Sequence, residues 1–97
     1  MTTNLGSATR TRTRLVIHGA VQGVGFRYTA LQIAENHAVA GYVRNLPSGG
    51  VELVAEGDAG PVEAFLQAVA NRMAGYIVEC KVHEEAPGGY QGFQVKH

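Results

Sequence analysis

The chain has 97 residues, of which 45% are hydrophobic and 16% charged, and its formal net charge is zero. This length suits one domain with a single core. The sequence has no apolar run near the ~20 residues of a membrane helix, no apolar leader and one cysteine, so we expect a cytoplasmic protein without a membrane partner or a disulfide.

The charges are unevenly distributed along the chain. Residues 1–14 carry three arginines and no acidic residue, whereas residues 15–97 carry five basic and eight acidic side chains, a net charge of −3. A net-negative body disfavours broad nucleic-acid binding. We interpret residues 1–13, which are polar and almost free of apolar side chains, as a disordered tail. A transit peptide or a contact with a polyanion are the alternatives for this segment.

A strand, a glycine-rich loop and a helix come first in the body of the chain. The β-branched segment Arg14–Ala20 predicts a strand, and Phe26–His37 predicts a helix. The helix carries an apolar stripe at helical spacing, made of Phe26, Ala30, Ile33, Ala34 and His37. Because Phe26 belongs to that stripe, we expect it in the core.

The loop between these elements favours an anion. Glycines let backbone N–H groups point into one concavity, and the helix N-terminus adds free donors and the positive end of its dipole. Arg27 stands in the first turn of the helix, where its planar guanidinium suits a phosphate. The order Gly19, Gly23, Gly25 fits neither G-x-x-x-x-G-K-S/T nor G-x-G-x-x-G. The residues alone therefore indicate a small anion, with phosphate preferred.

A hairpin follows, and then a second helix. Segments Ala38–Leu46 and Val51–Glu56 predict two strands joined by a Pro-Ser-Gly-Gly turn, which places Asn45 near a strand end. Asparagine is common beside turns, so a purely structural Asn45 is the alternative to a functional one. Pro61 begins a helix with an apolar stripe of Val62, Phe65, Leu66, Val69 and Met73.

Two further strands complete the predicted fold. Tyr76–Glu85 alternates between apolar and charged residues, and Tyr90–Lys96 predicts a short last strand. No basic cluster flanks Cys80, so we expect it to be a small buried hydrophobe and not a nucleophile. The order of elements predicts an α+β, ferredoxin-like split β-α-β sandwich: an antiparallel sheet with two helices on one face.

Two motifs resemble the signatures of the acylphosphatase family. The first is V-Q-G-V-G-F-R at residues 21–27. The second is G-Y-V-R-N at residues 41–45, followed by Gly49, Gly50 and Val51. A Y-x-G-F sequence at residues 90–93 is also similar to the family's C-terminal end. The resemblance covers residues 14–97 and implies an acylphosphatase-like domain with the ferredoxin-like fold.

The resemblance also implies an activity and its residues. The family hydrolyses acyl phosphates to a carboxylate and inorganic phosphate without a metal or another cofactor. By this resemblance Arg27 would bind the phosphoryl group and Asn45 would orient the attacking water. Backbone N–H groups of the loop would hold the phosphate, at Gln22, Gly23, Val24, Gly25, Phe26 and Arg27.

The sequence departs from the family pattern at three places. Tyr42 stands where a Trp is more usual, Ala30 stands where relatives often carry a hydroxyl, and the chain ends in Lys96-His97 where relatives often end in an aromatic residue. The expected partners are the small acyl phosphate and its phosphate product, with no nucleic acid. A single domain with its own core is expected to be a monomer.

Two alternatives keep the fold and change the function. RNA-recognition domains share the plan and stack bases on exposed aromatics of their central strands. Here Phe26 and Tyr28 begin a helix, and the first and third strands carry no aromatic residue, which disfavours a non-catalytic RNA- or anion-binding module. Acylphosphatase-like domains also occur inside larger enzymes that handle carbamoyl phosphate. With no zinc-finger cysteines and no further domain in the sequence, a free-standing hydrolase is preferred.

Overall fold

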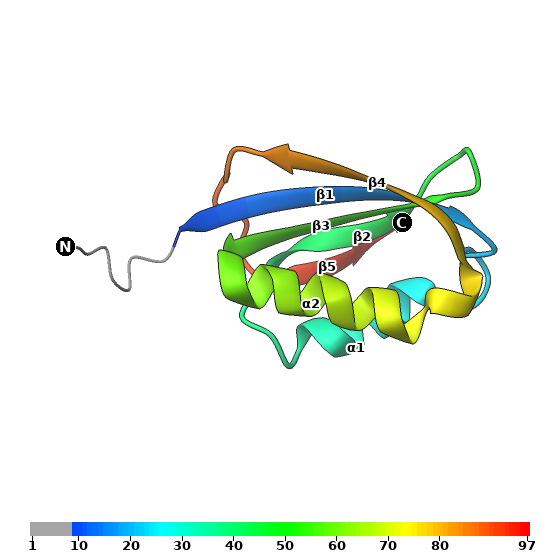
Figure 1. The fold of residues 1–97 in the computed structure, drawn as a ribbon, viewed down its shortest axis with the longest axis horizontal. Coiled ribbons are helices and arrows are strands. Elements are labelled where there is room, and N and C mark those ends of the chain that lie inside the picture. The colour runs from blue at the N-terminus through cyan, green and yellow to red at the C-terminus, as the bar shows by residue number, and fades with distance from the viewer. Residues whose placement is uncertain (1–8) are drawn as a thin grey trace.

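A computed structural model describes residues 9–97 as two helices against one sheet (Figure 1). The sheet has five strands in the order β4-β1-β3-β2-β5, and both helices cover the same face of it. In chain order the elements are β1 (Arg10–Gly19), α1 (Phe26–Ala34), β2 (Ala40–Asn45), β3 (Val51–Asp58), α2 (Ala59–Arg72), a short 3₁₀ turn (Ala74–Tyr76), β4 (Ile77–Glu85) and β5 (Phe93–Lys96). The predicted ferredoxin-like α+β fold is confirmed.

The sheet differs from the prediction in being mixed. β1 is antiparallel to both β3 and β4, and β2 is antiparallel to β3, but β5 is parallel to β2. The reason is the path of the chain after β4. Strand β4 lies at one edge of the sheet, and β5 lies at the other. The chain crosses the sheet between them and returns in the opposite direction, which is the direction of β2.

The core lies between the sheet and the two helices. Phe26 and Phe65, one from each helix, are among the largest fully or almost fully buried side chains. They pack with alternate residues of the central strands, such as Ile17 and Leu53. Both predicted helical stripes therefore face the sheet, as expected for amphipathic helices whose apolar face covers one side of a sheet.

β1 begins four residues earlier than expected, at Arg10, so residues 10–13 belong to the sheet and not to a tail. The reason is that the side chains which alternate between the two faces of this part of the strand are all polar. Thr13 is buried on the helix side, while Arg12 and Arg14 lie on the opposite face beside acidic partners. The remainder of the expected tail, residues 1–8, lies outside the described residues.

Cys80 is exposed, which corrects the expectation that it is buried. It lies on β4, the outer strand, where α2 does not cover the sheet fully. Alternation of apolar and charged residues predicts which face a side chain joins, but not whether a helix covers that face at the edge of the sheet.

No helix within residues 9–97 is long and apolar enough to cross a membrane.

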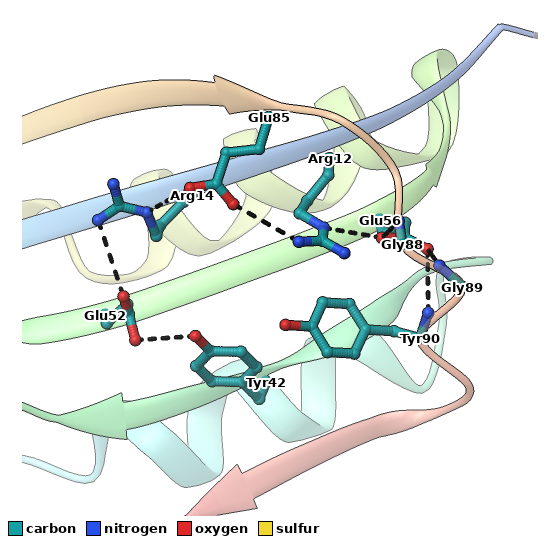
Figure 2. Close-up of polar contacts among 9 residues, drawn as sticks. All are labelled: Arg12, Arg14, Tyr42, Glu52, Glu56, Glu85, Gly88, Gly89 and Tyr90. Carbon is teal, nitrogen blue, oxygen red and sulfur yellow. Dashed lines mark hydrogen bonds and ion pairs between the residues drawn. The ribbon is translucent and has the colours of Figure 1, made fainter.

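The sheet face opposite the helices carries a network of ion pairs centred on β3 (Figure 2). Glu56 has a fully buried side chain and accepts hydrogen bonds from Arg12 Nε and from the backbone N–H groups of Gly88, Gly89 and Tyr90. Glu56 therefore fastens the crossing segment between β4 and β5 to the central strand. Burial alone would raise the pKa of Glu56, but these four donors outweigh it and hold the pKa at about 2.

A second carboxylate on β3, Glu52, organises the other half of the network. It accepts hydrogen bonds from the Tyr42 hydroxyl at 2.9 Å and from Arg44 Nε at 2.6 Å. Burial, followed by the hydrogen bond to Glu52, raises the pKa of Tyr42 to about 12. Arg44 is exposed, yet its ion pair with Glu52 gives it a structural role on this face.

Candidate functional site

The loop between β1 and α1 presents unpaired backbone donors at the start of a helix. Gly23 and Gly25 have φ angles of 82° and 78°, the left-handed conformation that glycine adopts without steric cost. The first helical bond runs from Thr29 N–H to the Gly25 carbonyl at 2.9 Å, and no side chain caps the helix. The first N–H groups of the helix, beginning with Phe26 and Arg27, are therefore left for a ligand, as is usual at a helix N-terminus.

The structure brings the loop, Arg27 and Asn45 together around one cavity. Its volume is about 250 Å³, and it is lined by Val21, Gly23, Gly25, Phe26, Arg27, Tyr28 and Asn45. Asn45 is the last residue of β2 and is paired with Val51, so the hairpin fixes its position at the strand end. Both residues to which the family resemblance assigned catalytic roles thus line the same cavity.

The electrostatics of this cavity suit an anion. Arg27 is the one charged residue in its lining, and no acidic side chain of the described residues lines it. The positive end of the α1 dipole adds to the same field. Tyr28 is 65% exposed, so an aromatic ring stands at the open side of the cavity. Residues 9–97 contain no group of three or more His, Cys, Asp or Glu side chains that could hold a metal ion.

Gln22 and Val24, two predicted members of the loop, do not line the cavity. The Val24 side chain is 38% exposed. The Gln22 side chain donates two hydrogen bonds of 2.8 Å, to the carbonyls of Leu46 and Gly50. These carbonyls belong to the β2–β3 turn, directly after Asn45. Gln22 therefore joins the loop to the turn, a role that the sequence did not indicate.

The end of β5 also reaches the site. Arg27 NH1 lies 3.3 Å from the Lys96 carbonyl, to which it donates, and 3.1 Å from Nδ1 of His97. This contact was not predicted from the sequence, because residue 97 lies beside Arg27 only once β5 has paired with β2. The parallel pairing of β5 with β2, with Lys96 opposite Arg44, brings the end of β5 beside Asn45. The parallel register is the structural cause of this contact.

Known proteins share both the sequence and the fold of this chain. The family model described as Acylphosphatase matches residues 13–95. The acylphosphatase of Methanospirillum hungatei is 41% identical over 87 residues, which cover 88% of this chain and 96% of that protein. The crystal structure of the Bacillus subtilis acylphosphatase superposes with a TM-score of 0.81 at 31% identity, covering 90% of this chain and 99% of that one.

A larger protein contains a similar unit. The structure of HypF from T. kodakarensis matches 90% of this chain with a TM-score of 0.77 and 32% identity, although the match covers only 12% of HypF. The family model and the full-length relatives agree over nearly the whole chain. The chain therefore belongs to the acylphosphatase family.

Proposed function

We propose that this protein is an acylphosphatase that hydrolyses the carboxyl–phosphate bond of acyl phosphates. The observation that carries the proposal is the cavity in which the loop between β1 and α1, Arg27 and Asn45 meet. The full-length relatives named Acylphosphatase support it, since they share about 40% of their residues with this chain. In this proposal the loop is a phosphate-binding loop, and its free N–H groups hold the phosphoryl oxygens.

The proposed reaction needs positioning and charge more than acid–base groups. The carboxylate that leaves an acyl phosphate is a weak base, so protonating it gains little. A water molecule attacks phosphorus in line with that carboxylate. The new P–O bond forms as the acyl P–O bond breaks, and the water gives up a proton as phosphate is released. Phosphoryl transfer passes through a loose transition state, whose charge the Arg27 guanidinium and the loop N–H groups neutralise.

Asn45 has a separate role in this proposal. Its side-chain oxygen accepts a hydrogen bond from the attacking water and so holds it in line with the leaving group. No step requires a metal or another cofactor. Arg27 and Asn45 line this cavity together with the loop of the same chain, so we propose a single chain as the catalytic unit.

The alternative of a nucleic-acid-binding module is not favoured. Phe26 is only 2% exposed and packs in the core, so its ring cannot stack on a base. On the open face of the sheet, β1 and β3 carry the ion-pair network and no Phe, Trp or Tyr, and the hydroxyl of Tyr42 on β2 is bonded to Glu52 within that network. We therefore propose a small-molecule substrate and no nucleic-acid partner.

The test of the activity compares phosphate release from benzoyl phosphate by wild type, Arg27→Ala and Arg72→Ala. Arg72 is a matched control, because it is an exposed arginine in the last turn of α2. Losing a cation aimed at a transferring phosphoryl group costs about 10³-fold or more in turnover, so Arg27→Ala should be nearly inactive and Arg72→Ala should match wild type. All reactions contain EDTA. Hydrolysis by Arg27→Ala near the wild-type rate, or full inhibition of wild type by EDTA, contradicts the mechanism.

The role of Asn45 is tested separately by Asn45→Ala. We expect turnover to fall by about 10²-fold, the scale of one lost positioning contact, while inorganic phosphate still inhibits with a nearly unchanged inhibition constant. The reason is that the phosphate ligands in the loop remain. If phosphate binding disappears and the circular dichroism spectrum is native, Asn45 is a phosphate ligand and not a water-orienting residue.

A further inference from the structure

One edge of the sheet lacks a partner strand within residues 9–97. β4 pairs with β1 along one side, and Figure 1 shows its other side facing outward. Every residue from Val78 to Glu84 is exposed, and the exposed fractions of Val78 and Val82 are 84% and 59%. An exposed edge strand with apolar side chains offers unpaired N–H and carbonyl groups to another strand.

The sequence of β4 is chemically symmetric about Cys80. Glu79 and Lys81 flank it, and Val78 and Val82 follow on either side. When two such strands run antiparallel with Cys80 opposite Cys80, each Val82 comes opposite the partner's Val78, which lies at a β-bulge because β4 has one residue more than β1 between Ile77 and Glu79. In the same register each Glu79 faces the partner's Lys81, so both charge pairs are complementary.

Neighbouring registers lose this match. Centring the pair on residue 79 places two glutamates opposite each other, and centring it on residue 81 places two lysines opposite each other. Like charges directly opposite one another destabilise a strand pair. Moving the centre by one residue slips the pairing by two. A slip of one residue instead places Cys80 opposite the partner's Glu79 or Lys81 and turns the apolar side chains of the two strands to opposite faces. Charge and apolar pattern therefore select the same register.

The helix side of β4 adds apolar surface to this edge of the sheet. A groove of about 380 Å³ runs between α2 and the strands β1 and β4, lined by Cys80, Val82, Leu15, Val62 and Leu66 among others. A two-fold pairing of β4 brings the grooves of two copies to either side of the new strand pair. Cys80 and Val82 of both copies then lie between two helices, and burying them gains the hydrophobic free energy that the isolated edge lacks.

We propose that two copies of this chain associate through β4, antiparallel and centred on Cys80, into one continuous two-fold symmetric sheet. The contact is a short strand pair at the small end of protein interfaces, so we expect a reversible dimer with a Kd of about 10⁻⁵–10⁻³ M. Each copy keeps its own cavity, since none of the cavity's lining residues belongs to β4. The expectation of a monomer then holds for the catalytic unit but not for concentrated solution.

The first test is a charge exchange followed by sedimentation velocity over a concentration series. Glu79→Lys places a lysine opposite the partner's Lys81 at both symmetric positions, and we expect Kd to rise about tenfold. The double variant Glu79→Lys/Lys81→Glu restores opposite charges and should return Kd to within about twofold of wild type. Thermal unfolding and benzoyl phosphate hydrolysis serve as controls for folding. A wild type that stays fully monomeric at ~1 mM, the upper limit of the expected Kd, or a double variant without recovery, overturns the proposal.

The second test uses Cys80, the one cysteine of the chain, as a reporter of the register. Added diamide takes two electrons and two protons from two thiols, and the disulfide forms as diamide becomes its hydrazine. The matched control is Val78→Cys/Cys80→Ser, whose thiol stands at a position that is 84% exposed in the wild type. In the proposed register its two thiols lie four residues apart, about 13 Å, beyond the reach of a disulfide. Disulfide dimers should form at least about tenfold faster at position 80; equal rates overturn the register.

Discussion

Gln22 is the residue that holds the two halves of the site together. Its amide donates to the carbonyls of Leu46 and Gly50, at 2.8 Å each, so one side chain spans the loop and the turn after Asn45. The distance between the free N–H groups of the loop, which we propose to bind phosphate, and Asn45 therefore depends on a residue outside the cavity lining. We infer that Gln22 is a positioning residue.

Replacing Gln22 by alanine should lower both stability and turnover. Each lost hydrogen bond is worth about 1 kcal/mol, so urea unfolding should show a loss of about 2 kcal/mol. We expect turnover of benzoyl phosphate to fall about tenfold as Asn45 loses its fixed position. The inhibition constant of phosphate should stay within about threefold, because the loop N–H groups remain.

Gln22→Glu is the sharper control for this contact. It keeps the shape of the side chain but has no donor for the two carbonyls at neutral pH, so it should be at least as unstable as Gln22→Ala. A Gln22→Ala variant with wild-type stability and turnover would contradict the positioning role. A large loss of phosphate affinity with normal stability would instead make the Gln22 side chain a phosphate ligand, because the substitution leaves its backbone N–H group in place.

Two glycines with positive φ serve different purposes in the loop and in β2. A Cβ added to Gly23 has no neighbour within 4 Å, so only its φ of 82° resists substitution. Gly41 has a φ of 137°, and its added Cβ would collide with the backbone carbonyl of Val54 on the neighbouring strand. The loop glycine provides a conformation, whereas the strand glycine provides close approach.

Alanine substitutions should separate these two purposes. Gly23→Ala should fold and lose about 1–2 kcal/mol of unfolding free energy, the cost of a left-handed non-glycine residue. Gly41→Ala should lose about 3 kcal/mol or more, because β2 and β3 must move apart as well. Urea unfolding of both variants measures the difference. Equal losses would show that backbone conformation alone, and not strand contact, requires Gly41.

The elements with strong apolar periodicity were predictable from the sequence, and those that depend on neighbouring strands were not. The helical spacing of Phe26, Ala30 and Ala34 predicts α1, and all three residues are buried. The start of β1 was missed because its first residues alternate Arg and Thr, whose burial depends on Glu56 and Glu85 across the sheet. Local pattern cannot reveal a partner that lies far away in the sequence.

The same division holds for the candidate site. The glycine loop, Arg27 and Asn45 were found from two local motifs, and the structure places them around one cavity. The contacts of Gln22 with the turn and of Arg27 with His97 were not found, because each joins segments that only the folded sheet brings together. The assigned roles of Arg27 and Asn45 stay predictions, as does the cytoplasmic location.

The molecule as a whole depends on a buried carboxylate on the face of the sheet without helices. Glu56 lies on β3 and connects this strand to β1 and to the segment that leads from β4 to β5. Its partners there are Arg12 and the backbone of residues 88–90 (Figure 2). β5 in turn lies beside β2 and brings Lys96 to Arg27. The Glu56 network thus fixes the strand order on which the site depends.

This network should make the protein sensitive to acid. The folded state holds the pKa of Glu56 at about 2, below its ordinary value of 4.5, so the unfolded state binds more protons between these values. The resulting stability is fully present above about pH 5 and is lost as the pH falls toward 2. The pKa of Glu85, lowered mainly by its hydrogen bond from Arg14, acts in the same direction. Wild type should therefore unfold at progressively lower urea concentration from pH 5 to pH 2.

Glu56→Gln isolates the contribution of this one group. The amide cannot titrate and turns an N–H group toward backbone donors, so we expect a loss of about 3 kcal/mol at pH 7. The difference in unfolding free energy between wild type and Glu56→Gln should then shrink as the pH falls from 5 to 2. Glu63→Gln, on the exposed side of α2, should keep the wild-type profile. If the Glu56→Gln and wild-type curves run parallel over this range, Glu56 does not carry the acid sensitivity, because a group with a depressed pKa must lose its stabilising effect once both states are protonated.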